Sequence, residues 1–214
     1  MLPYRCLILD LDGTVLDSHA YTFAAVRHAC QPFVAPPDDG AIHARFGPDE
    51  RIILRSFVGA ADADAAYARL QHYYAEHAHE VRLHAAVPPL LEACRRAGVS
   101  RGLFTGRGKD SAHLLLRATA LQDHFDAVVA GDEARPKPAP DGILLLLQQL
   151  GRHAGETLVV GDSPLDLQAA AAAGAAAALA TWFARGVTAS DIGARRLGSP
   201  SDLWEWLALS PPGA

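Results

Sequence analysis

Short apolar runs alternate with helical patterns along most of this chain. Five runs, each ending in small or polar residues, predict buried strands at residues 6–12, 99–106, 125–133, 157–163 and 176–181. Between the later runs, the spacing of apolar positions predicts helices at residues 87–98, 110–121, 140–151 and 163–174. This alternation is typical of a parallel sheet covered by helices, so we expect an α/β fold with a five-stranded parallel sheet.

The segment after the first strand breaks this alternation. Residues 15–86 contain no convincing strand, but the stretches at 20–33 and 62–81 have helical patterns separated by turn-rich junctions. We therefore expect a Rossmann-like core made of residues 1–15 and 87–214, with an α-helical domain at 16–86 inserted after the first strand. A closing helix is predicted at 199–210, with Trp204 packed inward.

Charge and composition narrow the possible partners. The 214 residues carry a formal net charge of −5, which predicts neither a basic surface for nucleic acid nor a polybasic stretch for a membrane. The three cysteines are far apart and lack metal-ligand spacing, which favours a reducing cytosol. The first residues lack the pattern of a signal peptide, and no apolar run is long enough to cross a membrane. We expect a soluble, cytoplasmic protein that binds a small molecule, as a monomer or a homodimer.

Polar residues follow the predicted strands where each one ends. Asp10 and Asp12 end the first strand, Thr105 and Gly106 end the second, and Asp162 ends the fourth. Asp166 lies one turn later, and Lys137 follows the third strand. Since ligands of open parallel sheets bind at the carboxyl ends of the strands, these residues are expected to meet at one edge of the sheet.

The closely spaced aspartates Asp10 and Asp12 need a partner. Residues two apart in a strand point to the same face, and two ionised carboxylates there repel each other. Burial without a partner would be costly, so a metal ion or a cationic ligand is implied. Asp162 and Asp166 supply further oxygen ligands, and such a set suits a hard ion such as Mg²⁺.

Thr105 and Lys137 each allow two interpretations. Thr105 either satisfies a backbone group at the strand end or holds a phosphate oxygen, together with free backbone N–H groups of Gly106 and Arg107. Lys137 lies between two prolines and is either a surface lysine or a cation that reaches inward. An inward lysine would neutralise a carboxylate and a phosphate at once, which would explain how an acidic protein captures an anion.

Four motifs in this chain resemble those of the haloacid dehalogenase superfamily of hydrolases, in its phosphoglycolate-phosphatase-like branch with a helical C1 cap. They are DLDGT at 10–14, FTGR at 104–107, Lys137 in PKPAPDG, and GDSPLD at 161–166, in the family's order. The resemblance covers nearly the whole chain, and it makes the helical insertion at 16–86 the cap domain.

The resemblance implies a role for each motif residue. Asp10 would attack phosphorus and form an aspartyl-phosphate, and Asp12 would act as general acid and then as general base. Mg²⁺ would be held by the Asp10 carboxylate, the Asp12 backbone carbonyl, Asp162 and Asp166, the last directly or through water. Thr105, Gly106 and Lys137 would bind the phosphoryl oxygens.

Some features distinguish this chain within the superfamily. The family commonly has Asn after the motif-two Thr, where this chain has Gly106. Dehalogenases and phosphonate-cleaving members lack the second aspartate, and the latter place a lysine in the cap, where residues 16–86 contain none. The expected function is a Mg²⁺-dependent phosphatase acting on a small, phosphoglycolate-like phosphate monoester. A sugar-phosphate phosphomutase of the same fold and a non-catalytic binding protein remain the alternatives.

Specificity is expected to come from the cap. His19 follows the first motif closely, and Arg45 and Arg51 flank the segment FGPDE. An arginine near the loop that contains Gly47 would suit a second anionic group on the substrate, such as the carboxylate of phosphoglycolate.

Overall fold

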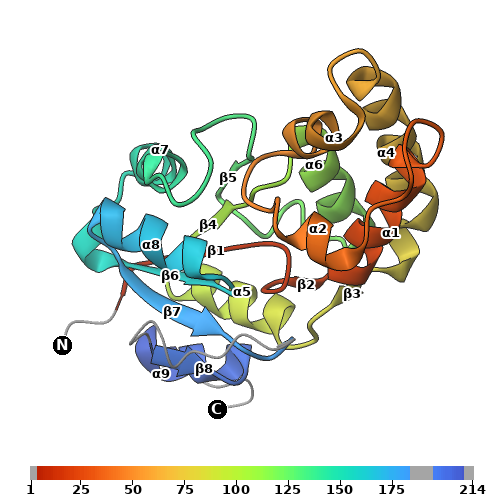
Figure 1. Cartoon of the computed structure of the whole chain (residues 1–214). Coiled ribbons are helices and arrows are strands. Elements are labelled where there is room, and N and C mark those ends of the chain that lie inside the picture. The colour runs from red at the N-terminus through yellow and green to blue at the C-terminus, as the bar shows by residue number, and fades with distance from the viewer. Residues whose placement is uncertain (1–3, 184–194, 210–214) are drawn as a thin grey trace.

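A six-stranded parallel sheet forms the centre of the protein, in a computed structural model that describes residues 4–183 and 195–209 (Figure 1). Its order is β5-β4-β1-β6-β7-β8. The strands are β1 (Cys6–Leu9), β4 (Ser100–Phe104), β5 (Ala127–Val129), β6 (Thr157–Gly161), β7 (Ala176–Ala180) and β8 (Arg195–Leu197). All five predicted strands are present, but the expectation of a five-stranded sheet was wrong. The sixth strand, β8, is a short edge strand with two exposed arginines, and such a sequence gives no buried-strand signal.

Side chains alternate between the two faces of this sheet, as the two-residue period of a strand requires. Cys6 and Ile8 of β1 belong to one buried cluster, with apolar residues of α7 (Asp141–Leu150) and α8 (Pro164–Ala173). Leu7 and Leu9 belong to a second cluster, on the face covered by α5 (Val87–Arg96), which also includes residues of α6 (Lys109–Ala118). The four helices predicted after residue 86 are therefore confirmed, and with them the α/β architecture.

A group of helices lies beside the sheet, on the right in Figure 1. The chain enters through β2 (Leu16–Asp17) and returns through β3 (Arg82–Leu83), and these strands form a small antiparallel sheet. Between them lie α1 (His19–Cys30), α2 (Asp39–His43), α3 (Glu50–Val58), α4 (Ala63–His77) and a 3₁₀ turn at Ala78–Glu80. We call residues 18–80 the helical segment.

The helical segment corrects the sequence prediction in two places. The expectation of no strand was wrong, because β2 and β3 pair over only two residues each and are too short to show a strand pattern. Helices α2 and α3 lie where turn-rich junctions were expected, and Asp38 and Asp49 accept hydrogen bonds from the first N–H groups of these helices. The division of the chain into a core and a separate cap domain stays a prediction.

The described part of the chain ends in α9 (Leu203–Trp206), which follows a 3₁₀ turn at Pro200–Asp202 that begins after Ser199. Trp204 is half-buried and packs against the main core, as expected. Residue 210, the last of the predicted closing helix, lies outside the described residues. Within the described ranges, every helix is too short or too polar to cross a membrane.

Candidate active site

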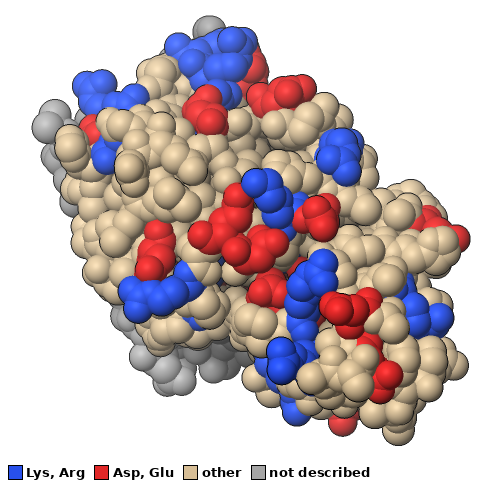
Figure 2. Space-filling view, turned by 90° about the horizontal axis from the view of Figure 1, so that it is seen from above, with Lys and Arg blue, Asp and Glu red and all other residues tan. Residues whose placement is uncertain are grey.

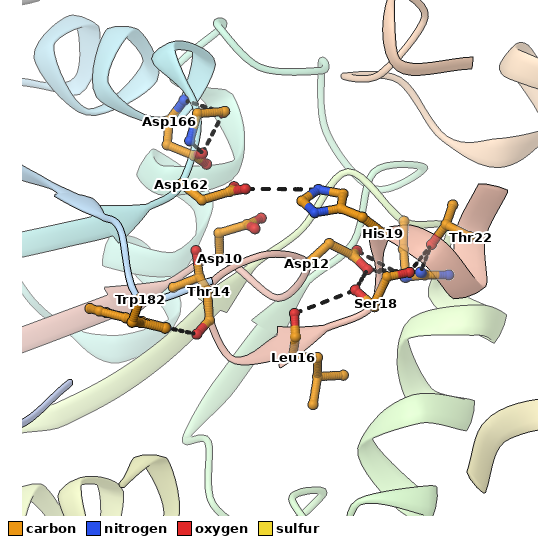
Figure 3. A network of polar contacts seen from close by, with 12 residues as sticks. Asp10, Asp12, Thr14, Leu16, Ser18, His19, Thr22, Asp162, Asp166 and Trp182 are labelled. Atoms are coloured by element: carbon orange, nitrogen blue, oxygen red, sulfur yellow. Dashed lines mark hydrogen bonds and ion pairs between the residues drawn. The ribbon is translucent and has the colours of Figure 1, made fainter. Parts of the chain in front are cut away.

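Acidic side chains from different parts of the fold meet at the carboxyl end of the sheet (Figure 3). Asp10 follows β1, Asp162 follows β6, and Asp166 lies in the first turn of α8. One oxygen from each of these carboxylates lies within 4.8 Å of the others. The meeting of these three aspartates, predicted from the strand ends, is therefore present in the structure.

Lys137 reaches this cluster from the loop after β5. Its Nζ donates to Asp10 Oδ1 at 2.6 Å, to Asp166 Oδ1 at 2.6 Å and to the carbonyl of Phe104 at 2.8 Å. The side chain is buried, so the ammonium group faces the cluster rather than solvent. These two carboxylates raise the pKa of Lys137 although burial opposes the charge, so this lysine is a fixed cation.

The carboxylate cluster carries more negative charge than Lys137 offsets. Burial, together with Asp166 and Asp12, raises the pKa of Asp10 to about 7 despite the neighbouring Lys137. Burial and the same kind of repulsion raise the pKa of Asp162 to about 9. Outside the cluster, the Nε2 of the His19 ring lies 3.8 Å from Asp162 Oδ2. An excess of closely packed carboxylate oxygens fits a divalent cation, so the donor set agrees with a metal site.

Asp12 has a different environment from Asp10. Arg107 binds it through Nε, at 3.0 and 2.9 Å from the two carboxylate oxygens, and through Nη2 at 2.7 Å. Ser18 donates a further short hydrogen bond to Oδ1. Burial alone would raise the pKa of Asp12, but the Arg107 guanidinium and these hydrogen bonds outweigh burial and lower it. Arg107 and Ser18 therefore fix the orientation of Asp12 and favour its carboxylate form over its protonated form; Figure 3 shows Asp12 beside Ser18.

Arg107 also connects the site to the helical segment. Its Nη2 donates to Thr22 Oγ1 at 2.5 Å, and its Nη1 lies 3.4 Å from Glu50 Oε1. Glu50 is buried, and it accepts hydrogen bonds from the Gly108 N–H at 2.7 Å and from Ser111 Oγ at 2.5 Å. Sequence reasoning considered only the backbone of Arg107 and missed Glu50. The two residues are 57 positions apart, so no local sequence signal could have revealed this pair.

Motif two differs in detail from the expectation. Thr105 is completely buried, and its hydroxyl accepts a hydrogen bond from the Arg107 N–H at 3.1 Å. The Arg107 N–H expected to be free is thus already used inside the motif. Gly106 lines the open cavity, and a Cβ at this position would lie 2.9 Å from the carbonyl oxygen of Gly47. The close approach of the helical segment explains why a residue with a side chain, such as the family's Asn, does not fit here.

Gly13 allows the side chains of Asp162 and His19 to lie close to the backbone of the first motif. Its φ of +76° belongs to the left-handed region, which favours glycine. A Cβ here would lie 2.1 Å from Asp162 Oδ2 and 2.7 Å from the His19 ring. Gly13 therefore leaves the space in which the Asp162 carboxylate faces Asp10.

A cavity of about 320 Å³ opens over these groups, between the sheet and the helical segment. It contains Asp10, Asp12 and Lys137 on the sheet side, and His19 and Phe46 on the other. A second cavity of about 340 Å³ adjoins it and shares three of its lining residues: His19, His43 and Asp162. The placement of His19 at the cavity agrees with its proposed role in the cap.

The two arginines expected beside the substrate lie elsewhere. Arg45 is exposed, donates to the carbonyl of Ala41 at 2.8 Å, and its guanidinium lies 4.3 Å above the Phe57 ring. Arg51 is also exposed and lies 3.7 Å above the Tyr67 ring. Neither belongs to the lining of the two cavities described above. The structure thus does not bring these arginines to the site.

Comparison with known proteins identifies the family. The family model of the haloacid dehalogenase-like hydrolases matches residues 7–180, which include all four motifs and the site assembled above. The chain belongs to the haloacid dehalogenase-like hydrolases. This membership confirms the resemblance given by the motifs.

Individual relatives are similar over most of the chain. A phosphoglycolate phosphatase of Rhodospirillum rubrum is 32% identical over 98% of this chain and 93% of its own length. The fructose-1-phosphate phosphatase YqaB of Escherichia coli is 32% identical over 80% of this chain and 93% of its own length. Among solved structures, CbbY from Rhodobacter sphaeroides in complex with phosphate has a TM-score of 0.83 at 19% identity, covering 96% of this chain and all of that chain. This last similarity concerns the fold.

Charges of both signs are mixed on one face of the molecule. On the face seen in Figure 2, Lys and Arg side chains are interspersed with Asp and Glu and form no continuous basic area. A nucleic-acid surface would require clustered positive charge, so this view gives it no support.

Proposed function

We propose that this haloacid dehalogenase-like hydrolase is a Mg²⁺-dependent phosphatase that hydrolyses small phosphate monoesters through an aspartyl-phosphate on Asp10. The observation that carries the proposal is the contrast between the two aspartates of the first motif. Asp10 faces Lys137 and the other carboxylates, whereas Asp12 is fixed beside it by Arg107 and Ser18. Two adjacent carboxylates in such different environments suit two different roles.

Asp10 is placed to act as the nucleophile. Its carboxylate lines the cavity and is accessible there, while Lys137 holds Oδ1 at 2.6 Å. In the first step an Asp10 oxygen forms a bond to phosphorus, and the bond from phosphorus to the ester oxygen breaks. In the second step water attacks phosphorus, and the bond to Asp10 breaks, so that free phosphate leaves and the carboxylate is regenerated.

Asp12 acts as the general acid in the first step and as the general base in the second. A proton on Asp12 is given to the departing ester oxygen, and the resulting carboxylate then accepts a proton from the attacking water. Arg107 stabilises the carboxylate form, which is the form needed for the second step. Lys137 provides positive charge for the phosphoryl oxygens, and Gly106 lines the same cavity with its backbone. Thr105 supports this loop through its bond to the Arg107 N–H.

Asp10, Asp162 and Asp166, with the backbone carbonyl of Asp12, would hold the Mg²⁺ ion. When bound, the ion supplies positive charge that offsets the carboxylates and the transferring phosphoryl group. The clustered oxygens and the raised pKa values of Asp10 and Asp162 support this assignment. We further propose that the helical segment acts as a cap over the site, because Glu50 binds Arg107 and Gly47 lies against Gly106.

Release of inorganic phosphate from a panel of phosphate monoesters tests this function. We expect release with Mg²⁺, none with EDTA, and none from Asp10→Asn, whose fold is checked by circular dichroism. Acid-quenched protein incubated with a ³²P-labelled ester should carry label in the wild type and none in Asp10→Asn. A phosphomutase would convert a sugar phosphate to its isomer without net phosphate release. Full activity of Asp10→Asn would refute the mechanism.

A further inference from the structure

We propose that the cavity selects phosphate monoesters whose alcohol is uncharged and carries an apolar or ring-shaped portion, and that it disfavours esters bearing a carboxylate. This inference rests on the proposed phosphatase function and concerns what occupies the rest of the same cavity. It departs from the expectation of a phosphoglycolate-like substrate. Charge and the apolar lining of the cavity carry it.

Among the residues that the structure describes around the cavity, no cation is left for a second anionic group. Among the described residues that line it, the permanently charged cations are Lys137 and Arg107. Lys137 is bound to Asp10 and Asp166, and as the cation nearest the nucleophile it serves the phosphoryl group. Arg107 is bound on one side by Asp12 and on the other by Glu50. Both edges of the Arg107 guanidinium therefore already form ion pairs with protein carboxylates.

The net charge of the lining is also unfavourable to a substrate carboxylate. Five lining residues are acidic: Asp10, Asp12, Glu50, Asp162 and Asp166. A divalent cation would offset two of the three negative charges that Lys137 and Arg107 leave, and the phosphoryl group adds negative charge of its own. His19 already faces a carboxylate of this site, because its Nε2 lies 3.8 Å from Asp162 Oδ2. A substrate carboxylate would lose water here without gaining a partner.

The cavity lining also contains apolar and aromatic side chains. Phe46 lies in the loop after α2, with the His19 ring stacked on it at a centroid distance of 5.9 Å and an angle of 21°. The His43 ring lies 5.6 Å from Phe46, and Ile53 of α3 and Leu165 of α8 also line the cavity. Flat rings and aliphatic chains are stabilised on such a surface.

The cavity volume agrees with this class of ligand. At about 320 Å³ the cavity lies near the lower end of the ~300–1,000 Å³ found for small-molecule sites, and the adjoining cavity of about 340 Å³ extends it. The phosphoryl group occupies the space beside Asp10, and the apolar side chains are left for the alcohol. A glycolate group would leave this apolar surface uncovered.

Two matched pairs of esters test the inference in the presence of Mg²⁺. Benzyl phosphate and 4-carboxybenzyl phosphate differ in one carboxylate, and ethylene glycol phosphate and phosphoglycolate differ in the same way at small size. We expect kcat/KM to be at least about tenfold higher for the uncharged member of each pair. We also expect benzyl phosphate to exceed ethylene glycol phosphate. A preference for phosphoglycolate over ethylene glycol phosphate would overturn the proposal.

Substitutions locate the effect. Phe46→Ala should raise KM for benzyl phosphate roughly tenfold and change KM for ethylene glycol phosphate little. Phe57→Ala is the matched control, because Phe57 is also half-buried against the core but lies outside both cavities. It should leave the ratio of the two KM values unchanged. A selective loss of phosphoglycolate hydrolysis in Arg45→Ala or Arg51→Ala would contradict the proposal.

The same assays separate failure of this inference from failure of the proposed function. If phosphoglycolate is hydrolysed best, with Mg²⁺ and with dependence on Asp10, the phosphatase function stands and the inference falls. If all four esters are inert with Mg²⁺, the proposed function is contradicted and the inference falls with it.

Discussion

Removal of the metal ion should make the stability of this protein depend on pH in an unusual direction. A buried Asp10 with its pKa raised from 3.8 to about 7 keeps its proton in the folded protein over a range in which the unfolded chain has lost it. The folded state then binds more protons than the unfolded state. The stabilisation is fully present below pH 3.8 and is lost as the pH rises through about 7.

The magnitude follows from the size of this shift. One pKa unit corresponds to ~1.4 kcal/mol, so Asp10 contributes at most about 4 kcal/mol to the free energy of unfolding. Asp162, whose pKa is raised to about 9, acts in the same direction and extends the range to about pH 9. These carboxylates interact closely, so they titrate together rather than singly.

Urea unfolding followed by tryptophan fluorescence measures the effect. Wild type and Asp10→Asn are compared in EDTA from pH 4 to pH 9, because the difference between them reports the contribution of Asp10 together with its coupling to Asp162. Asp12 and His19, whose pKa values are lowered, make both proteins lose stability as the pH falls, and this contribution largely cancels in the comparison. We expect the wild type to lose about 4 kcal/mol relative to Asp10→Asn between pH 4 and pH 8.

Saturating Mg²⁺ should reverse the direction in which the free energy of unfolding changes with pH. The ion binds the ionised carboxylates, so it stabilises the folded state more as the pH rises. If the free energy of unfolding of the wild type minus that of Asp10→Asn stays constant or rises with pH in EDTA, the assigned environment of Asp10 is refuted. An identical pH dependence with and without Mg²⁺ would refute the metal assignment.

Two further predictions concern the contact between the helical segment and the sheet. Glu50→Ala should lower the free energy of unfolding by about 3–5 kcal/mol, because it leaves one edge of the buried Arg107 guanidinium without a partner. Glu50→Gln should lower it by only ~1–2 kcal/mol. Equal losses of the two variants in urea unfolding would contradict this prediction. Gly106→Ala should cost about 1–3 kcal/mol and lower kcat/KM, because its Cβ would lie 2.9 Å from the Gly47 carbonyl. Gly155→Ala, at a position with open space around it, is the control and should change neither quantity.

The strand ends explain why so much could be predicted from the sequence. An apolar run that stops at an aspartate identifies both a buried strand and the position of its last carboxylate, so Asp10 and Asp162 could be placed at one edge without a structure. For Lys137 the sequence left two interpretations open, a surface lysine or an inward cation, and the structure has the inward one, bound to Asp10 and Asp166. Local patterns determine these features, and parallel topology brings them together.

Features that depend on contacts between distant segments could not be predicted in this way. Arg107 and Glu50 are far apart in the chain, and either alone has the sequence of an ordinary surface charge. The position of Arg45 above the Phe57 ring of α3 likewise depends on a contact between two separate segments. The edge strand β8 was missed because its exposed residues carry no apolar pattern.

The paired strands β2 and β3 have a consequence for how the helical segment can move. Leu16 pairs with Leu83 and Asp17 with Arg82, so the two crossings between the helical segment and the sheet form one short ribbon. Two hydrogen-bonded strands bend more easily across their plane than they stretch or shear. For the cap proposed above, this ribbon would be the hinge, because both crossings lie in it. Closure about this hinge would bring Gly47 against Gly106, so the ribbon would set the geometry of the cavity together with the residues that line it.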